Sequence, residues 1–581
     1  MKKKLDKLIR ATLKKTQYGD IFLSFLEHDL YLERTRDQKF GDFSSNIALR
    51  VSKKINKPPL DLANEIVELI PKNDLLDKIT VEGPGFINFY LSELAYHQEI
   101  EKIINQKNKY GESNIGENIN IIVEYVSANP TGPLHVGHGR HAAYGASVAN
   151  MLKTTGHEVF QEYYINDAGR QMDILTISVF LRYLEINNIN LTFPKKAYQG
   201  DYVINIAKKI KEKYKSSLTQ SCEDFISNIQ TFVGDEEKLL DKIILDMNKL
   251  IGPNVFINIK DLALGIVIKD IKSDLEEFGV KFDRWYSEKE LTENKILETI
   301  KTLEKNNYIY TDKDAKWFKS SVLGDEKDRV LIKSNGSKTY FASDIAYHLE
   351  KIQRGFKSLI NIFGADHHGY TPRILAGIEA LNHKKEIIEF NIVQFVALFR
   401  GKKKTQMSTR SGNYVTLREL RKEVGNDAAR FFYIFRSNDQ HLNFDLELAK
   451  TQSNDNPVYY IQYAHARISS LLKQTKINPI DIDERYLSNL STLSELSEKN
   501  LFVMASKYPE IIESASANRA PHQLAHYLRD LAAAFHTFYN SERILSNDES
   551  IKKSRIVLSV AIKIILKNGL SILGVSAPES M

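Results

Sequence analysis

Two histidines three positions apart, His135 and His138, are the residues with the clearest chemical potential. They follow a stretch rich in proline and glycine, residues 127–133, which favours a tight loop. Two imidazoles in such a place can donate hydrogen bonds to a phosphate whose charge grows in a transition state. Taken alone, an H-x-G-H pattern more often marks ordinary surface histidines near a helix cap. The neighbouring elements therefore decide between the two interpretations.

The residues on either side predict a strand, a loop and the N-terminus of a helix. Residues 121–126 are β-branched and aromatic, which favours a buried strand. Apolar residues then recur at helical spacing over 142–152, and Gly156 suits a helix C-cap. A second apolar strand over about 158–165 completes a βαβ unit with parallel strands. Because a helix N-terminus attracts anions, this context favours the phosphate-binding interpretation.

Asp366, His367 and His368 form a second group of chemically active side chains. They follow the apolar run 359–363, at the carboxyl edge where α/β sheets bind ligands. A metal site would need a third or fourth ligand at a recognisable spacing, and the sequence offers none. We therefore predict contact with a bound substrate here, and no metal held by the protein.

Composition limits the class of protein without identifying it. The 581 residues suggest about four domains. With 80 Lys+Arg against 74 Asp+Glu the net charge is only +6, so a polyanion must meet local basic patches. The single cysteine, Cys222, excludes an intramolecular disulfide and suits a reducing compartment. No run approaches 18 apolar residues, so no membrane span is expected, and the basic N-terminus predicts an amphipathic helix.

Changes of pattern along the chain divide it into three predicted regions. Residues 1–112 alternate helices with short strands and end in a linker-like stretch, and residues 441–581 are helical. Residues 113–440 contain the two halves of a nucleotide-binding sheet, separated by an insertion at about 191–330. Strands of the second half are expected at 329–332, 359–363 and 392–396.

Several long motifs in one order resemble those of a known family. Residues 124–138 resemble the first signature of class I aminoacyl-tRNA synthetases in the form found in arginyl-tRNA synthetases. Further similar segments cover most of the chain: 83–88, 164–169, 364–370, 407–412 and 456–467. The resemblance implies an α/β fold with a parallel Rossmann-type catalytic core, an N-terminal α+β domain and a C-terminal helical bundle.

The resemblance also implies a reaction and its partners. Arginine would be activated by ATP, accompanied by Mg²⁺, to arginyl-adenylate and then transferred to the 3′ end of an arginine-specific tRNA. His135, His138 and the loop would stabilise charge at phosphorus, a step that needs positioning more than a protein nucleophile. We expect a cytoplasmic monomer that contacts no membrane and has no editing site.

The site residues carried over from the family fall into two overlapping groups. A guanidinium requires carboxylates as planar partners. The expected arginine-binding residues are Glu124, Ser127, Asn129, His138, Tyr340, Asp344 and Asp366. The expected ATP-binding residues are Pro130, Gly132, His135, Gly137, His138, Gly364, His367, Met407, Ser408 and Arg410. On sequence alone, Asp344 also suits an ordinary helix N-cap.

The second class I signature departs from the usual Lys-Met-Ser-Lys-Ser. Gln406 and Thr409 occupy the two lysine positions of the loop at about 401–413. Lys402, Lys403, Lys404 and Arg410 remain nearby, and Lys404 is the predicted catalytic replacement. The alternative is that these cations form only a solvated basic loop.

Contacts with tRNA are expected at both ends of the chain. The resemblance places Asn46 beside the outer corner of tRNA, although an Asx-capped turn explains this residue equally well. Tyr460, Tyr463 and the chain end at Met581 are expected near the anticodon, where unpaired bases stack on rings. A Tyr stripe at helical spacing also suits a helix core.

Two other functions compete with this interpretation. One is a different H-x-G-H nucleotidyltransferase that adenylates a small acid and needs no RNA. The other is a tRNA-binding paralogue without catalysis, suggested by Gln406 and Thr409. The intact first signature with Glu124 and Asp344 argues against the second.

Overall fold

Five parallel strands form the centre of the molecule. The computed structural model describes residues 1–581 except 27–31, 402, 405–413, 476–481 and 483. The strand order is β12-β11-β5-β6-β7, with every neighbouring pair parallel. The bounds are Ile388–Val393 (β12), Ser358–Gly364 (β11), Asn120–Glu124 (β5), Glu158–Ile165 (β6) and Arg284–Ser287 (β7). Ile121, Ile122 and Val123 are all at most 2% exposed, as in a parallel sheet covered on both faces.

The predicted βαβ unit is present, with a shorter first strand than expected. Helix α6 (Val136–Thr154) connects β5 to β6, and Gly156 follows its end with a φ of 87°. Strand β5 ends at Glu124, because Val126 and Ser127 adopt φ angles of 68° and 39°. Such strained backbone costs about 1–3 kcal/mol per residue and persists where the surroundings impose it. Here the turn directs the Ser127 Oγ back towards Glu124 and the backbone N–H of Tyr164.

Two segments in the middle of the chain pair differently from expectation. Within the range 191–330, β7 returns to the central sheet beside β6, so the chain leaves that sheet twice. Strand β10 (Arg329–Ile332) was expected in the second half of the central sheet, but it pairs antiparallel with β9 in a separate sheet. Apolar periodicity predicts that a short segment is a strand, but it does not specify the pairing partner.

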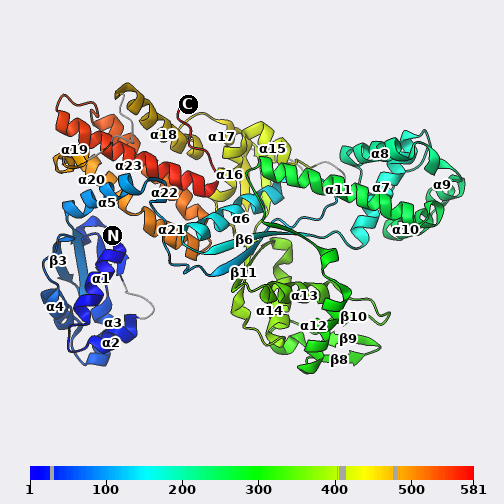
Figure 1. Cartoon of the computed structure of the whole chain (residues 1–581), viewed down its shortest axis with the longest axis horizontal. Coiled ribbons are helices and arrows are strands. Elements are labelled where there is room, and N and C mark those ends of the chain that lie inside the picture. Colours follow the sequence, from blue (N-terminus) through cyan, green and yellow to red (C-terminus); the bar gives the residue numbers. More distant parts are fainter. Residues whose placement is uncertain (27–31, 402, 405–413, 476–481, 483) are drawn as a thin grey trace.

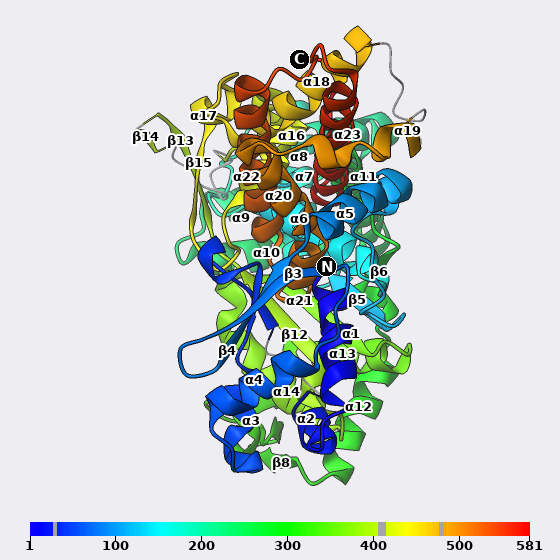
Figure 2. The ribbon, with the colours of Figure 1, turned by 90° about the vertical axis from the view of Figure 1, so that its left-hand side faces the viewer.

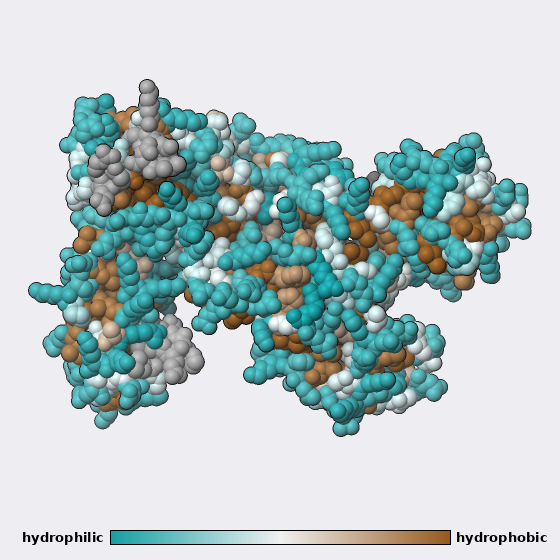
Figure 3. Space-filling view, in the orientation of Figure 1, coloured by the Kyte–Doolittle hydropathy of each residue, from teal (hydrophilic) through white to brown (hydrophobic). Residues whose placement is uncertain are grey.

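Two excursions flank β7. The first, after α7 (Arg170–Ile186), is a helical arm, at the right of Figures 1 and 3, made of α8 (Asp201–Tyr214), α9 (Glu223–Gln230), α10 (Glu236–Ile251) and α11 (Pro253–Glu277). The second contains α12 (Glu293–Lys305), β8 (Ile309–Asp312), β9 (Ala315–Phe318) and β10. The chain then re-enters the core through α13 (Tyr340–Gln353), β11 and α14 (Thr371–Ala380).

The N-terminal domain is a four-stranded sheet with helices. Its strands follow the order β1-β2-β4-β3, with bounds Leu32–Arg34, Phe43–Ser45, Phe86–Leu91 and Leu76–Glu82. Its helices are α1 (Lys2–Leu13), α2 (Gly19–Leu26), α3 (Ile47–Ile55) and α4 (Pro59–Leu69), and α5 (Glu93–Gln106) leads into the core. Arg34 docks the domain on the C-terminal helices through two hydrogen bonds to Glu510, of 2.7 and 3.1 Å. The N-terminal domain and the C-terminal helices lie one above the other in Figures 1 and 2.

The C-terminal region is a helical bundle. Its helices are α18 (Pro457–Thr475), α19 (Glu484–Leu487), α20 (Leu496–Ser506), α21 (Tyr508–Ala517), α22 (Pro521–Ser541) and α23 (Glu549–Leu573). The elements that connect the core to these helices are β13 (Val396–Arg400), β14 (Lys403–Lys404), α15 (Leu417–Val424), α16 (Asn426–Phe435), β15 (Leu442–Asp445) and α17 (Leu446–Lys450). Contrary to the expectation from apolar runs, α23 is long and apolar enough to cross a membrane, and the bent pair α10 and α11 also passes that test. The most apolar part of α23 is 72% buried, as in the core helix of a bundle.

A buried arginine joins three parts of the chain. Arg430 of α16 is 1% exposed and donates hydrogen bonds to the carbonyl oxygens of Phe278 (2.9 Å) and Leu573 (3.2 Å). Phe278 follows α11 of the arm, and Leu573 ends α23 of the bundle. The negative ends of two helix dipoles therefore stabilise this cation where no carboxylate is needed.

Candidate active site

His135 and His138 begin α6 in a reciprocal cap. The Nδ1 of His135 accepts hydrogen bonds from the backbone N–H groups of Gly137 (3.1 Å) and His138 (3.3 Å). The Nδ1 of His138 accepts one from the backbone N–H of His135 (3.3 Å), and the rings stack with centroids 3.6 Å apart. Burial lowers the pKa of both imidazoles, that of His138 further because His135 is adjacent. Each neutral ring must therefore carry its proton on Nε2, as a hydrogen-bond donor.

Two cavities meet at this cap and share Asn129 and His138. One, the histidine-loop cavity, has a volume of about 380 Å³ and lies between the loop and the helical arm. Its walls include Gly132, His135, Arg170, Lys196, Tyr202 and Tyr414. The other, the carboxylate cavity, has a volume of about 450 Å³ and lies at the carboxyl ends of β5, β6, β7 and β11. The two together offer adjoining spaces for an anion and a cation.

The carboxylate cavity contains two acidic side chains without a basic partner among the described residues, Asp344 and Glu288. Asp344 accepts a hydrogen bond of 2.5 Å from the Tyr370 hydroxyl, and burial raises its pKa to about 7. Burial also raises the pKa of Glu288, and its Oε2 has no hydrogen-bond partner in the described structure. An enclosed carboxylate of this kind is costly until a cation or a proton reaches it.

Glu124 differs from these two because it is already paired. Its Oε2 forms an ion pair with Lys351, which is fully buried, and its Oε1 accepts a hydrogen bond of 3.1 Å from Ser127 Oγ. Glu124 itself is 5% exposed and still lines the cavity. Its negative charge is therefore already compensated inside the protein.

Most residues predicted to bind small substrates gather around the two cavities. The carboxylate cavity is lined by Glu124, Ser127, Asn129, His138, Tyr340, Asp344, Gly364, Asp366 and His367, and the histidine-loop cavity by Asn129, Gly132, His135 and His138. Pro130 and Gly137 belong to the same loop and cap but line neither cavity. Asp344 lies inside helix α13, whose N-cap is Thr339, so it is not an N-cap residue. Met407, Ser408 and Arg410 lie outside the described residues.

Four further residues of this site were not identified from the sequence. Glu288 follows β7, a four-residue strand inside the expected insertion. Lys351 and His141 belong to helices whose patterns indicate only core packing, and Tyr370 ends the motif 364–370 but was given no role there. The position of Glu288 at the carboxyl end of a strand was the available signal, but it requires knowing that β7 joins the central sheet.

A change of pH should change arginine binding through Asp344. The predicted arginine site requires Asp344 as a charged partner of the guanidinium, and the raised pKa of about 7 means that protons would compete with arginine below pH 7. We expect arginine affinity to be nearly constant from pH 8 to 9 and to fall roughly 30-fold by pH 5.5. Calorimetric titration with arginine across this range tests the expectation. An affinity that is flat from pH 5.5 to 8 would contradict it.

Lys404 lies on a short hairpin rather than in a cavity wall. Strand β14 pairs antiparallel with β13, and Lys403 and Lys404 are both exposed. Neither cavity includes Lys404, and the residues that follow it, 405–413, are not described. Its catalytic role therefore stays a prediction.

If the Lys404 ammonium reaches the β- and γ-phosphates of ATP, Lys404→Ala is expected to lower the rate of adenylate formation by about 10²-fold. Lys403→Ala, one residue away and pointing to the other side of the strand, is the matched control. Single-turnover adenylate formation measures both. If the rate falls by less than about threefold in both variants, these lysines form only a solvated basic surface.

The N-terminal domain has an open cavity around Asn46. Its volume is about 520 Å³, and Arg34, Arg36, Phe40 and Phe86 contribute to its walls. Phe40 and Phe86 are 38% and 41% exposed, so their rings are available for stacking. Asn46 occupies the N-cap position of α3 but makes no side-chain cap hydrogen bond, and its buried Oδ1 has no partner in the described structure. The Asx-cap alternative thus loses its main support.

The C-terminal residues predicted to contact tRNA differ in exposure. Tyr463 of α18 is 36% exposed and stacks on Tyr459; both Tyr463 and Tyr460 contact His536, with ring centroids 5.5 Å and 4.5 Å away. Met581 is 54% exposed at the chain end, which His465 holds through a 2.8 Å hydrogen bond to the Pro578 carbonyl oxygen. Tyr463 and Met581 are therefore more accessible than Tyr460.

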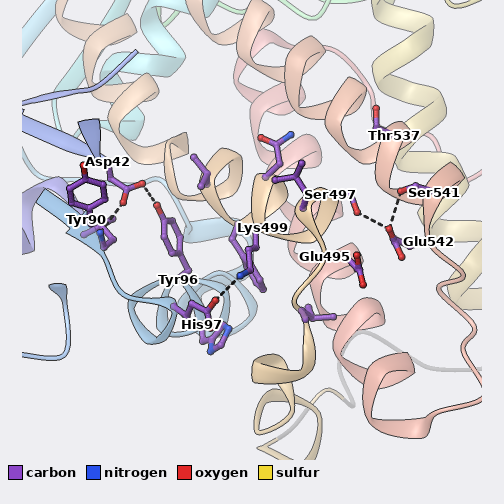
Figure 4. Close-up of a pocket in the computed structure, with 18 residues that line it drawn as sticks. Asp42, Tyr90, Tyr96, His97, Glu495, Ser497, Lys499, Thr537, Ser541 and Glu542 are labelled. Carbon is purple, nitrogen blue, oxygen red and sulfur yellow. Dashed lines mark hydrogen bonds and ion pairs between the residues drawn. The ribbon is translucent and has the colours of Figure 1, made fainter. Parts of the chain in front are cut away.

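A larger cavity, of about 800 Å³, lies between the N-terminal domain and the bundle (Figure 4). It is lined by residues such as Tyr90, Glu93, Leu496 and Lys499, and no predicted site residue belongs to its described lining. Within the described part of the chain, no three His, Cys, Asp or Glu side chains gather closely enough to hold a metal. The candidate active site is therefore the pair of cavities at the sheet edge.

The parallel sheet, with paired histidines starting the helix after its central strand, agrees with the catalytic domain of a class I aminoacyl-tRNA synthetase. Family models described as "tRNA synthetases class I (R), catalytic domain", "Arginyl tRNA synthetase N terminal domain" and "DALR anticodon binding domain" match residues 99–452, 3–91 and 461–581. The chain belongs to the arginyl-tRNA synthetase family. The predicted family and α/β fold class are thereby confirmed.

Individual proteins agree with this assignment over the whole chain. An arginine--tRNA ligase of Coxiella burnetii (strain RSA 331 / Henzerling II) is 48% identical, with 100% of both chains covered. One from Legionella pneumophila subsp. pneumophila (strain Philadelphia 1) is 45% identical, again over 100% of both. The solved structure of Thermus thermophilus arginyl-tRNA synthetase shares the fold, with a TM-score of 0.74 at 20% identity and 100% of both chains covered.

Proposed function

We propose that this chain is an arginine--tRNA ligase. A carboxylate oxygen of L-arginine attacks the α-phosphorus of ATP, the bond to pyrophosphate breaks, and arginyl-adenylate forms. The terminal ribose hydroxyl of tRNA then attacks the arginyl carbonyl and releases AMP. The observation that carries this proposal is Asp344, an enclosed carboxylate without a basic partner in the described structure, in a cavity that adjoins two neutral Nε2–H donors.

The charges of the carboxylate cavity suit arginine. Its guanidinium would lie against Asp344 and Glu288, whose oxygens offer a planar partner for the donor fork. Ser127, Asn129 and Asp366 would hold the α-amino and carboxylate groups, and Tyr340, 62% exposed, would close one wall. Glu124 was expected among the direct partners, but its carboxylate is already paired with Lys351.

ATP would place its phosphates at the N-terminus of α6. The Nε2–H groups of His135 and His138, at the positive end of the helix dipole, would meet the α-phosphate, while Pro130, Gly132 and Gly137 keep the loop backbone close. Gly364 and His367 would contact the adenosine, and Met407, Ser408 and Arg410 would complete the site from the signature loop. Mg²⁺ bound to ATP would neutralise phosphate charge.

Two surfaces would contact tRNA. The cavity around Asn46 suits an unpaired base, stacked on Phe86 and hydrogen-bonded to the free Asn46 amide. Tyr460, Tyr463 and Met581 would contribute at the anticodon end. We further propose a cytoplasmic monomer without an editing site, because a polar pocket rejects amino acids lacking a guanidinium at the binding step.

Phe86→Ala should weaken tRNA binding by about 5- to 150-fold, since stacking of one base on an aromatic ring contributes about 1–3 kcal/mol. The ring is 41% exposed, so the fold should tolerate its loss. Filter binding of arginine tRNA measures the effect. Tyr310→Ala, a 36% exposed aromatic in the second excursion, is the control. Equal affinities for the two variants would exclude this cavity as a base site.

The direct test is a charging assay with arginine, ATP and total tRNA, followed by acid-gel analysis. Arginylated tRNA is the expected product, and pyrophosphate exchange should require tRNA. Robust exchange without RNA would favour the small-acid adenylating enzyme. Binding of tRNA with no adenylate would favour the non-catalytic paralogue.

A further inference from the structure

A lysine beneath the carboxylate cavity is tied to the site without lining it. Lys351 is fully buried near the end of α13 and is absent from the residues that face the cavity. Its ammonium pairs with Glu124 of β5, lies 3.0 Å from Asn361 Oδ1 of β11, and sits 4.2 Å from the centre of the Tyr347 ring. It therefore ties α13 to two neighbouring strands of the central sheet, in which Asn361 is paired with Glu124.

The same contacts reach Asp344 through a short chain of hydrogen bonds. The Asn361 side-chain amide lies 3.2 Å from His348 Nε2, and His348 Nδ1 lies 2.8 Å from the Asp344 carbonyl oxygen. His348 burial lowers its pKa to about 3, so the ring stays neutral near pH 7. Lys351 is thus connected to the helical turn that presents Asp344, two turns away on the same helix.

Glu124 is the carboxylate that this arrangement withdraws from substrate. One of its oxygens is taken by Lys351 and the other by Ser127, so its charge is compensated inside the protein. Asp344 and Glu288 have no ion-pair partner among the described residues and face the same space. If Lys351 were neutral, three uncompensated carboxylates would compete for one guanidinium.

We propose that Lys351 is a positioning residue that determines specificity: by neutralising Glu124 it leaves Asp344 and Glu288 as the carboxylates that receive the guanidinium. The proposal rests on the proposed function, because it assigns arginine to this cavity. It also reassigns Glu124, from direct partner of arginine to counter-ion of Lys351.

The two roles of Glu124 make opposite predictions for paired substitutions. If Glu124 is a counter-ion, Glu124→Gln leaves an uncompensated ammonium beneath the cavity, which repels the guanidinium. Adding Lys351→Met then removes that charge and should restore binding. If Glu124 contacts arginine directly, the second substitution restores nothing. Such a cycle isolates coupling between neighbouring residues.

The experiment compares wild type, Glu124→Gln, Lys351→Met and the double variant in arginine calorimetry and in charging kinetics. We expect Glu124→Gln to raise the arginine Kd at least 10-fold, with the effect in KM more than in kcat. The double variant should return to within about threefold of wild type. A double variant as weak as Glu124→Gln would overturn the proposal.

A pH series gives a second readout that general destabilisation would not produce. In Lys351→Met, the buried Glu124 loses its cation, which favours the protonated carboxyl and adds a group to the pH profile of arginine binding. The titratable groups that face Glu124 are Asp344 and Tyr347 of α13 and Tyr164 of β6, and Glu288 faces Asp344. All four remain in the double variant, where the added group should disappear. If the extra titration is still present in the double variant, it belongs to a residue other than Glu124, and the proposal is refuted.

Folding and the proposed function are controlled separately. Melting curves identify a variant that does not fold, and Glu124→Gln with Lys351→Gln, two amides without charge, then replaces the double variant. Failure of wild type to bind or charge arginine would refute the proposed function. In that case the counter-ion role is still tested, because single variants that melt no lower than the double variant would contradict it.

Discussion

Replacing Asp344 with asparagine is expected to weaken arginine binding by about 30- to 5,000-fold. The variant keeps the Tyr370 hydrogen bond, because an amide oxygen also accepts it, but the guanidinium loses a charged partner in an enclosed cavity. Removing one partner of such a charge pair costs about 2–5 kcal/mol. Rejection of the neutral analogue citrulline, about 10⁴-fold in wild type, should shrink in parallel.

Calorimetry and thermal melting together test this prediction. The pKa of Asp344 is raised from 3.8 to about 7 by folding, so the ligand-free fold loses stability as the pH rises from about 4 to 7 and stays destabilised above that range. The ligand-free Asp344→Asn variant should therefore melt higher than wild type at pH 8, with a smaller difference at pH 5.5. Asp274→Asn is the matched control, because Asp274 is a buried aspartate of the helical arm and is paired with Arg421 of α15. Arginine affinity that is equal in both variants would remove Asp344 from the substrate site.

Replacing His138 with alanine is expected to lower the charging rate by about 10²-fold or more, with little change in the KM for ATP. A neutral Nε2–H donor aimed at developing charge strengthens in the transition state, and binding of the ground state depends on it less. The variant also loses the Nδ1 acceptor of the helix cap, so melting curves must accompany the kinetics.

Two controls separate chemistry from folding in this case. His97→Ala, in a ring contact with Phe502 far from the sheet edge, should charge normally. His138→Asn retains a donor and should recover part of the loss. Charging by His138→Ala within about threefold of wild type would exclude the proposed stabilisation at phosphorus.

The parts of the fold that the sequence predicts well are those encoded locally. The strand, loop and helix around His135 follow from residue types over about 40 neighbouring positions, and the structure contains β5, α6 and β6 there. The strand at 329–332 was predicted from the same kind of pattern, but the prediction that it joins the central sheet was wrong. Pairing depends on residues far along the chain, which a local pattern cannot specify.

The residues of the site also divide into those that local sequence predicts and those that depend on distant parts of the chain. Motif matches brought nine predicted residues to one cavity wall, although their roles stay predictions. Glu288 was missed because the strand that precedes it, β7, has only four residues. The partner of Glu124 lies 227 positions away, and nothing in the local sequence of Lys351 distinguishes it from a surface lysine. The left-handed turn at Val126 was equally hidden, because β-branched residues favour extended backbone.

The position of Arg430 bears on whether this molecule can be divided. Its guanidinium satisfies carbonyl groups at the ends of α11 and α23, and cutting the chain between α17 and α18 would leave the arginine buried with fewer acceptors. The C-terminal helices would meanwhile expose the apolar face that packs on α6 and α16. We therefore expect these regions to lose structure in one cooperative transition, and fragments made by protease or by gene truncation to be insoluble apart but to assemble when expressed together.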